Sequence, residues 1–507
     1  MKNKFNILLV IIWIFGLYAC EDFLDRPPIA DLDPSNYFRS EKEIRSATLN
    51  VFTYLSGVRR IEHEHFTDNM YGKKNGDAIS YTHGIHTPAL SIFYSTWSES
   101  YKGIAQANLL INAEFGDNVT ESVKDSYLGD AYFMRAYYYS ELLFHYGEVP
   151  ILTGTPSVVG DIFPPKSTME EVKQQVLNDL TEALDRVPRD PEKGRAGLGA
   201  AYMLKAKLHI FFDEWESAKN AALEVIGLDK YGLFDDFRSL FYAENGDNDE
   251  VIFSIQYLAT LRNNTFYQRI TNGTQYSPSL SIANEFEMAN GMEIDEAGSG
   301  YDPQQPYLNR DPRYNVSILT PGDSRVVDGV LSPQLGRAPK SKTGLLVDKY
   351  RKWGESYEFY NGSDWILMRY ADLLLLYAEA LNETETSPGQ AVYDAVNAVR
   401  TRVGLPDLPA GLSKEDMRMR IRKERRVELA MEGHRLFDIF RWKIGEEALQ
   451  PLEGYNAGKL EDLETLEFKV KTVDGDRSFN AAKGYFWPIP QTEIDLNTKL
   501  EQNPNFD

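Results

Sequence analysis

Cysteine is almost absent from this chain of 507 residues, because Cys20 is the only one. An exported protein that depends on disulfides would show an even number of cysteines, so a disulfide framework is excluded. The N-terminus also lacks a long apolar run. Its uncharged stretch, residues 7–19, has thirteen residues, whereas a membrane-spanning helix needs about 20.

Positive charge is scarce relative to negative charge. Lys and Arg number 54 against 76 Asp and Glu, which gives a formal net charge of −22. Nucleic acids and anionic lipid surfaces would repel such a chain, so we do not expect them as partners. The G-x-S-x-G, Walker and G-x-G-x-x-G motifs are also missing, and enzyme classes that depend on them lose support.

The surroundings of Cys20 predict its function. Two lysines precede the apolar run and Ala19 lies directly before the cysteine, which is typical of a secretory signal peptide. Together with Leu17, this pattern resembles the lipobox of bacterial lipoproteins. We therefore expect residues 1–19 to be the signal peptide, Cys20 to be the lipidation site, and residues 20–39 to be a tether and docking stretch. The alternative is a free thiol beside an ordinary cleavage site.

From residue 40 onward the apolar residues follow a helical period. The pattern predicts helices over residues 40–56, 92–115, 121–146, 168–187, 197–213, 215–227, 366–382, 388–403 and 413–443. We expect a helical region at 40–235 and a second region at 236–507. The second region starts with a loop-rich segment, 236–365, in which one strand-like run covers 251–257. Insertions of this length are more often functional surfaces than spacers.

The predicted helices fall into four pairs. Within 197–227, Tyr202, Ala206, Trp215 and Ala218 lie near the large and small positions of a tetratricopeptide unit of about 34 residues. The other pairs are 367–382 with 390–402, 121–146 with 168–187, and 40–56 with 92–115. Each match alone is also what plain core packing would give. Four pairs predict a mainly α fold, a tetratricopeptide-like superhelix of helical hairpins with a loop-rich ligand-binding portion and minor β structure.

Five segments along almost the whole mature chain resemble the SusD/RagB family: 129–152, 369–383, 395–409, 421–442 and 485–506. The pattern E-R-R-x-E-L-x-x-E-G-x-R-x-x-D-x-x-R-W in the fourth segment is long and specific. The resemblance implies an outer-membrane lipoprotein that faces the cell exterior, binds oligosaccharide or polysaccharide, and delivers it to a SusC-like TonB-dependent transporter. It implies no catalytic activity and no cofactor.

Two alternatives to glycan binding stay open. The first is a binder of another nutrient, such as a peptide or a glycoconjugate, in the same role. The second is a glycoside hydrolase, which would need two carboxylates about 5–10 Å apart in a cleft. Glu424, Glu428 and Glu432 could be taken for such acids, but we expect them to form a half-buried lattice of ion pairs. The nearby arginines are the expected partners: Arg420, Arg425, Arg435 and Arg441.

Four of the seven histidines lie within 24 residues: His63, His65, His83 and His86. Their spacing could converge on a transition metal. No standard zinc motif spans the stretch, so we expect exposed, metal-free side chains on a polar loop over the binding pocket.

A glycan site needs aromatic platforms for the apolar faces of sugars and polar side chains for their hydroxyl groups. Two stretches outside the repeat helices offer both. The candidates in residues 62–87 are Phe66, Asp68, Asn69, Tyr71, Tyr81 and His83. Those in residues 257–307 and 350–365 are Tyr267, Tyr276, Tyr301, Trp353, Tyr357 and Tyr360. No catalytic or metal-ligating residue is expected among them.

Overall fold

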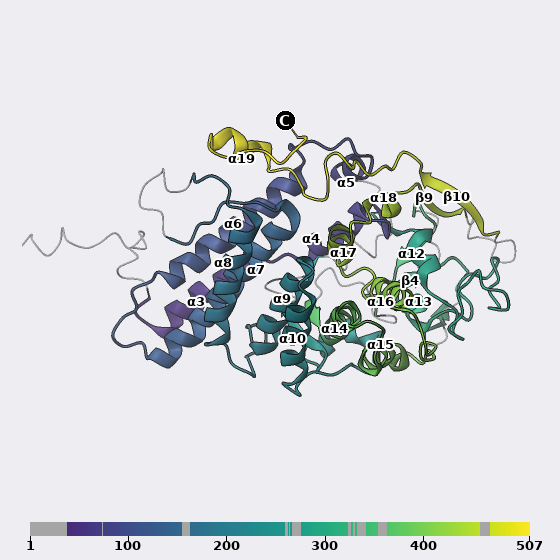
Figure 1. Cartoon of the computed structure of the whole chain (residues 1–507), viewed down its shortest axis with the longest axis horizontal. Helices are drawn as coiled ribbons and strands as arrows, with labels where there is room; N and C mark the ends of the chain where they lie inside the picture. The colour runs from purple at the N-terminus through teal and green to yellow at the C-terminus, as the bar shows by residue number, and fades with distance from the viewer. Residues whose placement is uncertain are drawn as a thin grey trace, which may run out of the picture.

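The structure is a computed structural model. It describes residues 38–72, 75–154, 163–258, 262, 264–265, 275–322, 326–327, 330–331, 341–352, 362–456 and 467–506. Within these residues the fold is mainly α-helical, with short two-stranded sheets (Figure 1). No helix in these segments is long and apolar enough to cross a lipid bilayer.

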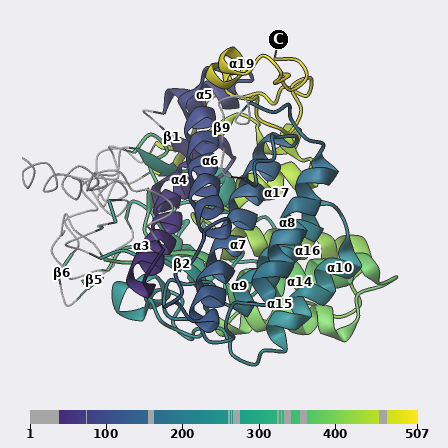
Figure 2. The same cartoon turned by 90° about the vertical axis from the view of Figure 1, so that its left-hand side faces the viewer.

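Four helix pairs form the scaffold, as predicted. The pairs are α3 (Glu41–Val51) with α6 (Ser91–Ile111), α7 (Glu121–Tyr146) with α8 (Met169–Leu184), α9 (Leu198–Phe211) with α10 (Trp215–Ile226), and α14 (Tyr370–Thr384) with α15 (Gln390–Arg402). Contacts of α6 with α7 and of α10 with α14 join one pair to the next. The pairs follow one another from α3 to α15 in Figure 1, and Figure 2 shows α3 and α6 on the side that faces the viewer.

Side-chain caps set the starts of several scaffold helices. Ser40 and Glu43 form a reciprocal capping box at α3, and Thr168 with Glu171 forms another at α8. Ser413 accepts a hydrogen bond from the backbone N–H of Asp416 and caps α16 (Lys414–Glu428). These caps satisfy backbone donors that have no partner inside the helix.

The predicted helix over 366–382 starts later than expected, because residues 365–369 form a strand. This strand, β8 (Trp365–Arg369), pairs antiparallel with β2 (Val251–Ile255), which confirms the strand-like run at 251–257. All five side chains of β8 are buried. A short, fully buried apolar run has no period that would distinguish a strand from a helix, so the sequence alone could not separate the two.

The single helix predicted over 413–443 is wrong. A turn at residues 429–434 separates α16 from α17 (Arg435–Trp442). In this turn Met431 and Gly433 have φ angles of +66° and +82°. A Cβ atom at Gly433 would lie 2.3 Å from the backbone oxygen of Arg60, so only glycine allows this close approach.

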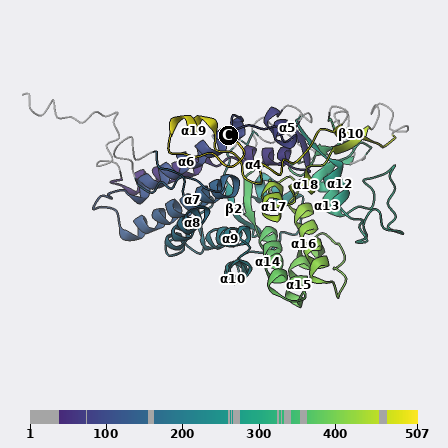
Figure 3. The ribbon, with the colours of Figure 1, turned by 45° about the horizontal axis from the view of Figure 1, so that its top comes forward.

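Apart from η1, which continues the helix predicted over 40–56, the shorter elements were not predicted individually, because segments this short show no clear period. The helical ones are η1 (Phe52–Tyr54), α4 (Gly57–His63), η2 (Glu64–Phe66), α5 (Gly76–Thr82), η4 (Ser239–Phe241), η5 (Ala243–Asn245), α12 (Leu280–Glu285), α13 (Pro312–Ser317), α18 (Gly445–Ala448) and α19 (Gln491–Leu496). The strands are β1 (Met70–Gly72), β3 (Tyr276–Pro278), β4 (Ile318–Leu319), β5 (Val326–Val327), β6 (Val330–Leu331), β7 (Leu346–Val347), β9 (Leu452–Asn456) and β10 (Lys469–Asp474). Figure 3 shows α5, α19 and β10 on the side of the molecule opposite α10 and α15.

The three glutamates of α16 and the following turn form an ion-pair lattice, but it is buried rather than half-buried. Glu424, Glu428 and Glu432 are each at most 4% exposed. Their partners are Arg313, Lys349, Arg369, Arg400 and Arg402, which come from outside α16. The four arginines expected as partners pair elsewhere: Arg420 with Glu293, Arg425 with Asp372, Arg435 with Asp68, and Arg441 with Glu379.

Burial opposes the ionisation of Glu428. The attraction of three arginines outweighs this effect and holds the pKa of the carboxyl well below its ordinary value: Arg402, Arg369 and Arg313. The ion pairs therefore hold α16 against β8 and α15. Their role is structural, and the glutamates do not form an acid/base pair.

Candidate functional site

A short β-ladder brings the two predicted ligand-binding stretches together. Strand β1, from residues 62–87, pairs antiparallel with β3, from residues 257–307. Tyr71 lies opposite Ser277 and Gly72 lies opposite Tyr276. The two stretches, about two hundred residues apart in the sequence, therefore lie side by side.

A cleft of about 400 Å³ opens beside this ladder. Its lining comes from α4, the first residues of α5 and α6, η2, and the start of β3. The lining residues are Arg59, Glu62, His65, Asn75, Gly76, Asp77, Ser91, Ile92, Ser95, Gln275 and Tyr276. The volume falls in the range of small-ligand sites, and most of the lining side chains are polar.

The charged groups of the cleft are tied to neighbouring side chains. Arg59 donates hydrogen bonds to Ser95 and to Glu99. Asp77 accepts hydrogen bonds from the hydroxyl of Ser91 at 2.6 Å and from the backbone N–H of Ile92 at 2.8 Å, and so fixes the start of α6 against α5. Burial raises the pKa of Glu99, and Arg59 opposes this shift. The hydrogen-bonding groups of the cleft are thus held in place by their neighbours.

His65 lies buried at the inner wall of the cleft. Its ring centroid is 4.7 Å from that of Tyr276, and its Nδ1 is 3.3 Å from the amide nitrogen of Asn75. Burial lowers the pKa of His65 to about 3, although a hydrogen bond with the backbone of Gln275 opposes this shift. The imidazole is therefore neutral near pH 7.

Three of the predicted aromatic platforms are buried in the structure. Phe66, Tyr81 and Tyr276 are between 1% and 6% exposed. Phe66 contacts Tyr81 edge-on and lies 6.0 Å from Trp487, a residue of the C-terminal segment. Of the three, only Tyr276 lines the cleft.

Two of the predicted polar contacts in this stretch, Asp68 and Asn69, are buried as well. Asp68 pairs with Arg426 and Arg435, and the oxygen of the Asn69 side chain accepts a hydrogen bond from Arg426. Burial opposes the ionisation of Asp68, but the two arginines outweigh it and lower the pKa of its carboxyl. In this conformation both side chains join η2 and β1 to α16 and α17 rather than facing a ligand.

The remaining described candidates, Tyr71, His83 and Tyr301, are half-buried and lie outside the cleft lining. His83 Nε2 is 2.8 Å from Oδ1 of Asp474 on β10. Burial and the nearby Asp474 carboxylate raise the pKa of Tyr71. Five candidates lie outside the residues that the structure describes: Cys20, Tyr267, Trp353, Tyr357 and Tyr360.

The expectation of exposed histidines is also wrong, since His63, His65 and His86 are buried and His83 is half-buried. Across the described segments, no group of three or more His, Cys, Asp or Glu side chains is placed to hold a metal ion. The four histidines do not share one site.

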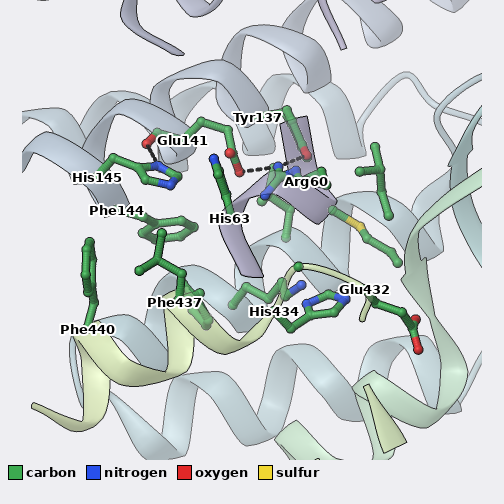
Figure 4. A pocket seen from close by; sticks show the side chains of 16 residues that line it. Arg60, His63, Tyr137, Glu141, Phe144, His145, Glu432, His434, Phe437 and Phe440 are labelled. Atoms are coloured by element: carbon green, nitrogen blue, oxygen red, sulfur yellow. Dashed lines mark hydrogen bonds and ion pairs between the residues drawn. The ribbon is translucent and has the colours of Figure 1, made fainter. Parts of the chain in front are cut away.

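His63 instead lines an internal cavity of about 50 Å³ together with His145 and His434 (Figure 4). Arg60, which pairs with Glu141 at 2.6 Å, lies on the same cavity. The volume is enough for a few water molecules and too small for a sugar chain.

Sequence reasoning missed most of the polar residues of the cleft. Arg59 lies on the short helix α4 and Ser95 on α6, whereas Asn75 is the N-cap of α5 and Gln275 directly precedes β3. The one local signal was Asn75-Gly76-Asp77, a turn-forming sequence between two structured segments.

Comparisons with known proteins agree with the fold. A profile of the SusD family matches residues 246–506, and a profile described as starch-binding and associating with the outer membrane matches residues 22–210. The predicted boundary between residues 235 and 236 stays a prediction.

Two curated relatives are SusD-like proteins of Formosa agariphila. P38 is 26% identical and the match covers 99% of each chain, while P25 is 25% identical over 88% of this chain and 92% of its own. A SusD-like protein of Bacteroides fragilis, solved by crystallography, is 27% identical with a TM-score of 0.80 and covers 94% of this chain and 99% of its own. A SusD-like carbohydrate-binding protein of the same species is 24% identical with a TM-score of 0.81 over 92% of this chain and 99% of its own, and shares the fold.

Proposed function

On the premise that the chain belongs to the SusD family, we propose that it is an outer-membrane lipoprotein that captures a glycan at the cell surface. It then delivers this glycan to a SusC-like TonB-dependent transporter. The description of the second profile, starch-binding and associating with the outer membrane, supports both the ligand class and the location.

The observation that carries the binding role is the polar cleft beside β1 and β3. Arg59, Asn75 and Gln275 come from three separate segments and converge on a cavity of about 400 Å³. Fixed donors and acceptors around a cavity of this size suit the hydroxyl groups of a sugar. Tyr71, His83 and Tyr301, with Tyr267, Trp353, Tyr357 and Tyr360, remain predicted contacts for a chain that extends beyond the cleft.

The ligand class is tested by native gel electrophoresis of the protein in gels that contain amylopectin, xylan, galactomannan, laminarin or pectin. We expect at least one polysaccharide to retard the protein without new reducing ends. New reducing ends would indicate a glycoside hydrolase instead. Retention by none of these polysaccharides, with binding of a peptide or glycoconjugate, would favour the other nutrient-binding role.

Replacing the lipidated cysteine should release the protein from membranes. If Cys20 carries the acyl chains, Cys20→Ala removes the acceptor thiol, and the buried hydrocarbon that anchors the protein is lost. We expect palmitate labelling and partition into Triton X-114 to disappear. Unchanged labelling of the variant would contradict lipidation at Cys20.

The transporter role predicts a stable complex. When the protein is purified at native expression level in a mild detergent, a large β-barrel protein of the TonB-dependent class should co-purify with it. Mass spectrometry identifies the partner. An isolated monomer under these conditions would count against delivery to a transporter.

A further inference from the structure

We propose that His65 is a positioning residue of the cleft, which holds the Asn75 amide and the Tyr276 ring in the orientation that receives the glycan. This inference rests on glycan binding at the cleft, and it assigns His65 a role that the spacing of the four histidines did not predict.

His65 contacts both residues directly. Its ring lies 4.7 Å from the Tyr276 ring at an interplanar angle of 32°, and its Nδ1 is 3.3 Å from Nδ2 of Asn75. His65 is only 5% exposed, whereas Asn75 is half-buried. The imidazole is therefore fixed by its surroundings, while the side chain that it contacts reaches the open part of the cleft.

The backbone above His65 is shaped to admit the ring. Gly72 lies opposite Tyr276 in the β1–β3 ladder. A Cβ atom at Gly72 would lie 2.7 Å from Cγ and 2.8 Å from Nδ1 of His65. Glycine within a strand often marks a close approach of another group, and here that group is the imidazole.

Asn75 is held from its other side as well. Its Oδ1 accepts a hydrogen bond from the backbone N–H of Ala78 at 3.1 Å, which caps α5. A side-chain amide has two N–H donors, and one of them is directed to Nδ1 of His65. The orientation of the amide is thus fixed, and its second N–H can donate to a hydroxyl group in the cleft.

The acceptor atom persists over the ordinary pH range. Because Nδ2 of Asn75 can only donate, its contact with Nδ1 requires the neutral tautomer of His65 that has a lone pair on Nδ1. Burial lowers the pKa of His65 to about 3, so the ring stays neutral at ordinary pH. Positioning by His65 requires no protonation change and no charge in the cleft.

A double-mutant cycle on affinity tests this role. His65→Phe keeps a ring against Tyr276 but removes the Nδ1 acceptor, and Asn75→Ser keeps a cap for α5 but removes the amide. The probe is the polysaccharide of the gel panel that retards the parent protein most. We expect each single variant to bind it about three- to tenfold more weakly, the effect of one hydrogen bond.

The double variant should have about the same affinity as the single variant that binds less tightly. The reason is that both substitutions break the same contact, the one between His65 and Asn75. His65→Asn, which restores an acceptor, should recover part of the affinity. Gly72→Ala, which displaces the imidazole, should weaken binding at least as much as His65→Phe. Thermal unfolding confirms that each protein is folded.

Two results would overturn the proposal. One is a folded His65→Phe or Gly72→Ala protein that binds within about twofold of the parent, and the other is a double variant whose loss is the product of the single losses. In both cases the parent still binds, so glycan binding itself would stand. A parent protein that binds none of the polysaccharides would overturn the proposed function and this inference together.

Discussion

Arg369→Met should destabilise the protein by about 3–5 kcal/mol, because the substitution removes one partner from a buried ion network. Arg369 is 1% exposed and donates hydrogen bonds to Glu250 at 2.7 Å and to Glu428 at 2.6 Å. It also contacts both carboxylate oxygens of Glu432 at 2.8 Å. Methionine fills a similar space but leaves these carboxylates without a central cation.

The unfolding free energy from urea titration measures this effect. Arg45→Met is the matched control, because Arg45 pairs with Glu192 at 3.5 Å on the surface and both side chains are more than half exposed. The control should change stability by less than about 1 kcal/mol. If Arg369→Met is as stable as Arg45→Met, the ion network does not stabilise the packing of α16 against β8 and α15.

Acid should destabilise the protein below about pH 6.5, the ordinary pKa of histidine, through the histidines of the internal cavity. Burial lowers the pKa of His63 well below that value, and His145 and Arg60 lower it further. Burial, with Lys207, lowers the pKa of His434 to about 3. As the pH falls, the unfolded chain takes up protons that the folded protein does not bind.

This difference in proton uptake sets the direction of the pH effect on stability. The stabilising effect of a neutral buried histidine is fully present above the unfolded pKa and is lost as the pH falls toward the folded pKa. Each such histidine contributes a slope of up to about 1.4 kcal/mol per pH unit. Glu64 and Asp130, whose pKa values burial raises to about 7 and about 6, act in the opposite direction.

A variant isolates the histidine effect from these carboxyl groups. His63→Phe keeps a ring beside Trp487 and His145 but cannot titrate. Relative to the parent, its unfolding free energy should rise by about 1.4 kcal/mol per pH unit as the pH falls from about 6.5. Parallel stability curves for the two proteins would show that His63 is not held neutral by the fold.

The long scaffold helices were predictable because each has several turns with one apolar face, and α7 and α9 match their expected bounds closely. The burial of Phe66 and Tyr81 was not predictable, because it depends on Trp487, which is more than four hundred residues away. An aromatic residue in a loop gives no local sign of whether a distant segment covers it.

The cleft depends on non-local pairing in the same way. The β1–β3 ladder places Gln275 near Asn75, and no local pattern in either stretch specifies that register. The sequence singled out the two stretches but not which of their side chains line the cleft. Of the described aromatic candidates, Phe66, Tyr81 and Tyr276 are buried, and polar residues such as Arg59 and Ser95 line most of the cavity.

The most direct test of glycan binding at the cleft fills the cavity without disturbing its frame. Gly76 lines the cleft at the first position of α5, and a Cβ atom there meets nothing within 4 Å. Gly232, outside the cleft lining, has equally open space and is the matched control. We expect isothermal titration with the polysaccharide that retards the parent to show at least a roughly tenfold loss of affinity for Gly76→Trp, equivalent to about 1.4 kcal/mol. Gly232→Trp should bind like the parent. Parent-like affinity in a folded Gly76→Trp protein would contradict binding at the cleft.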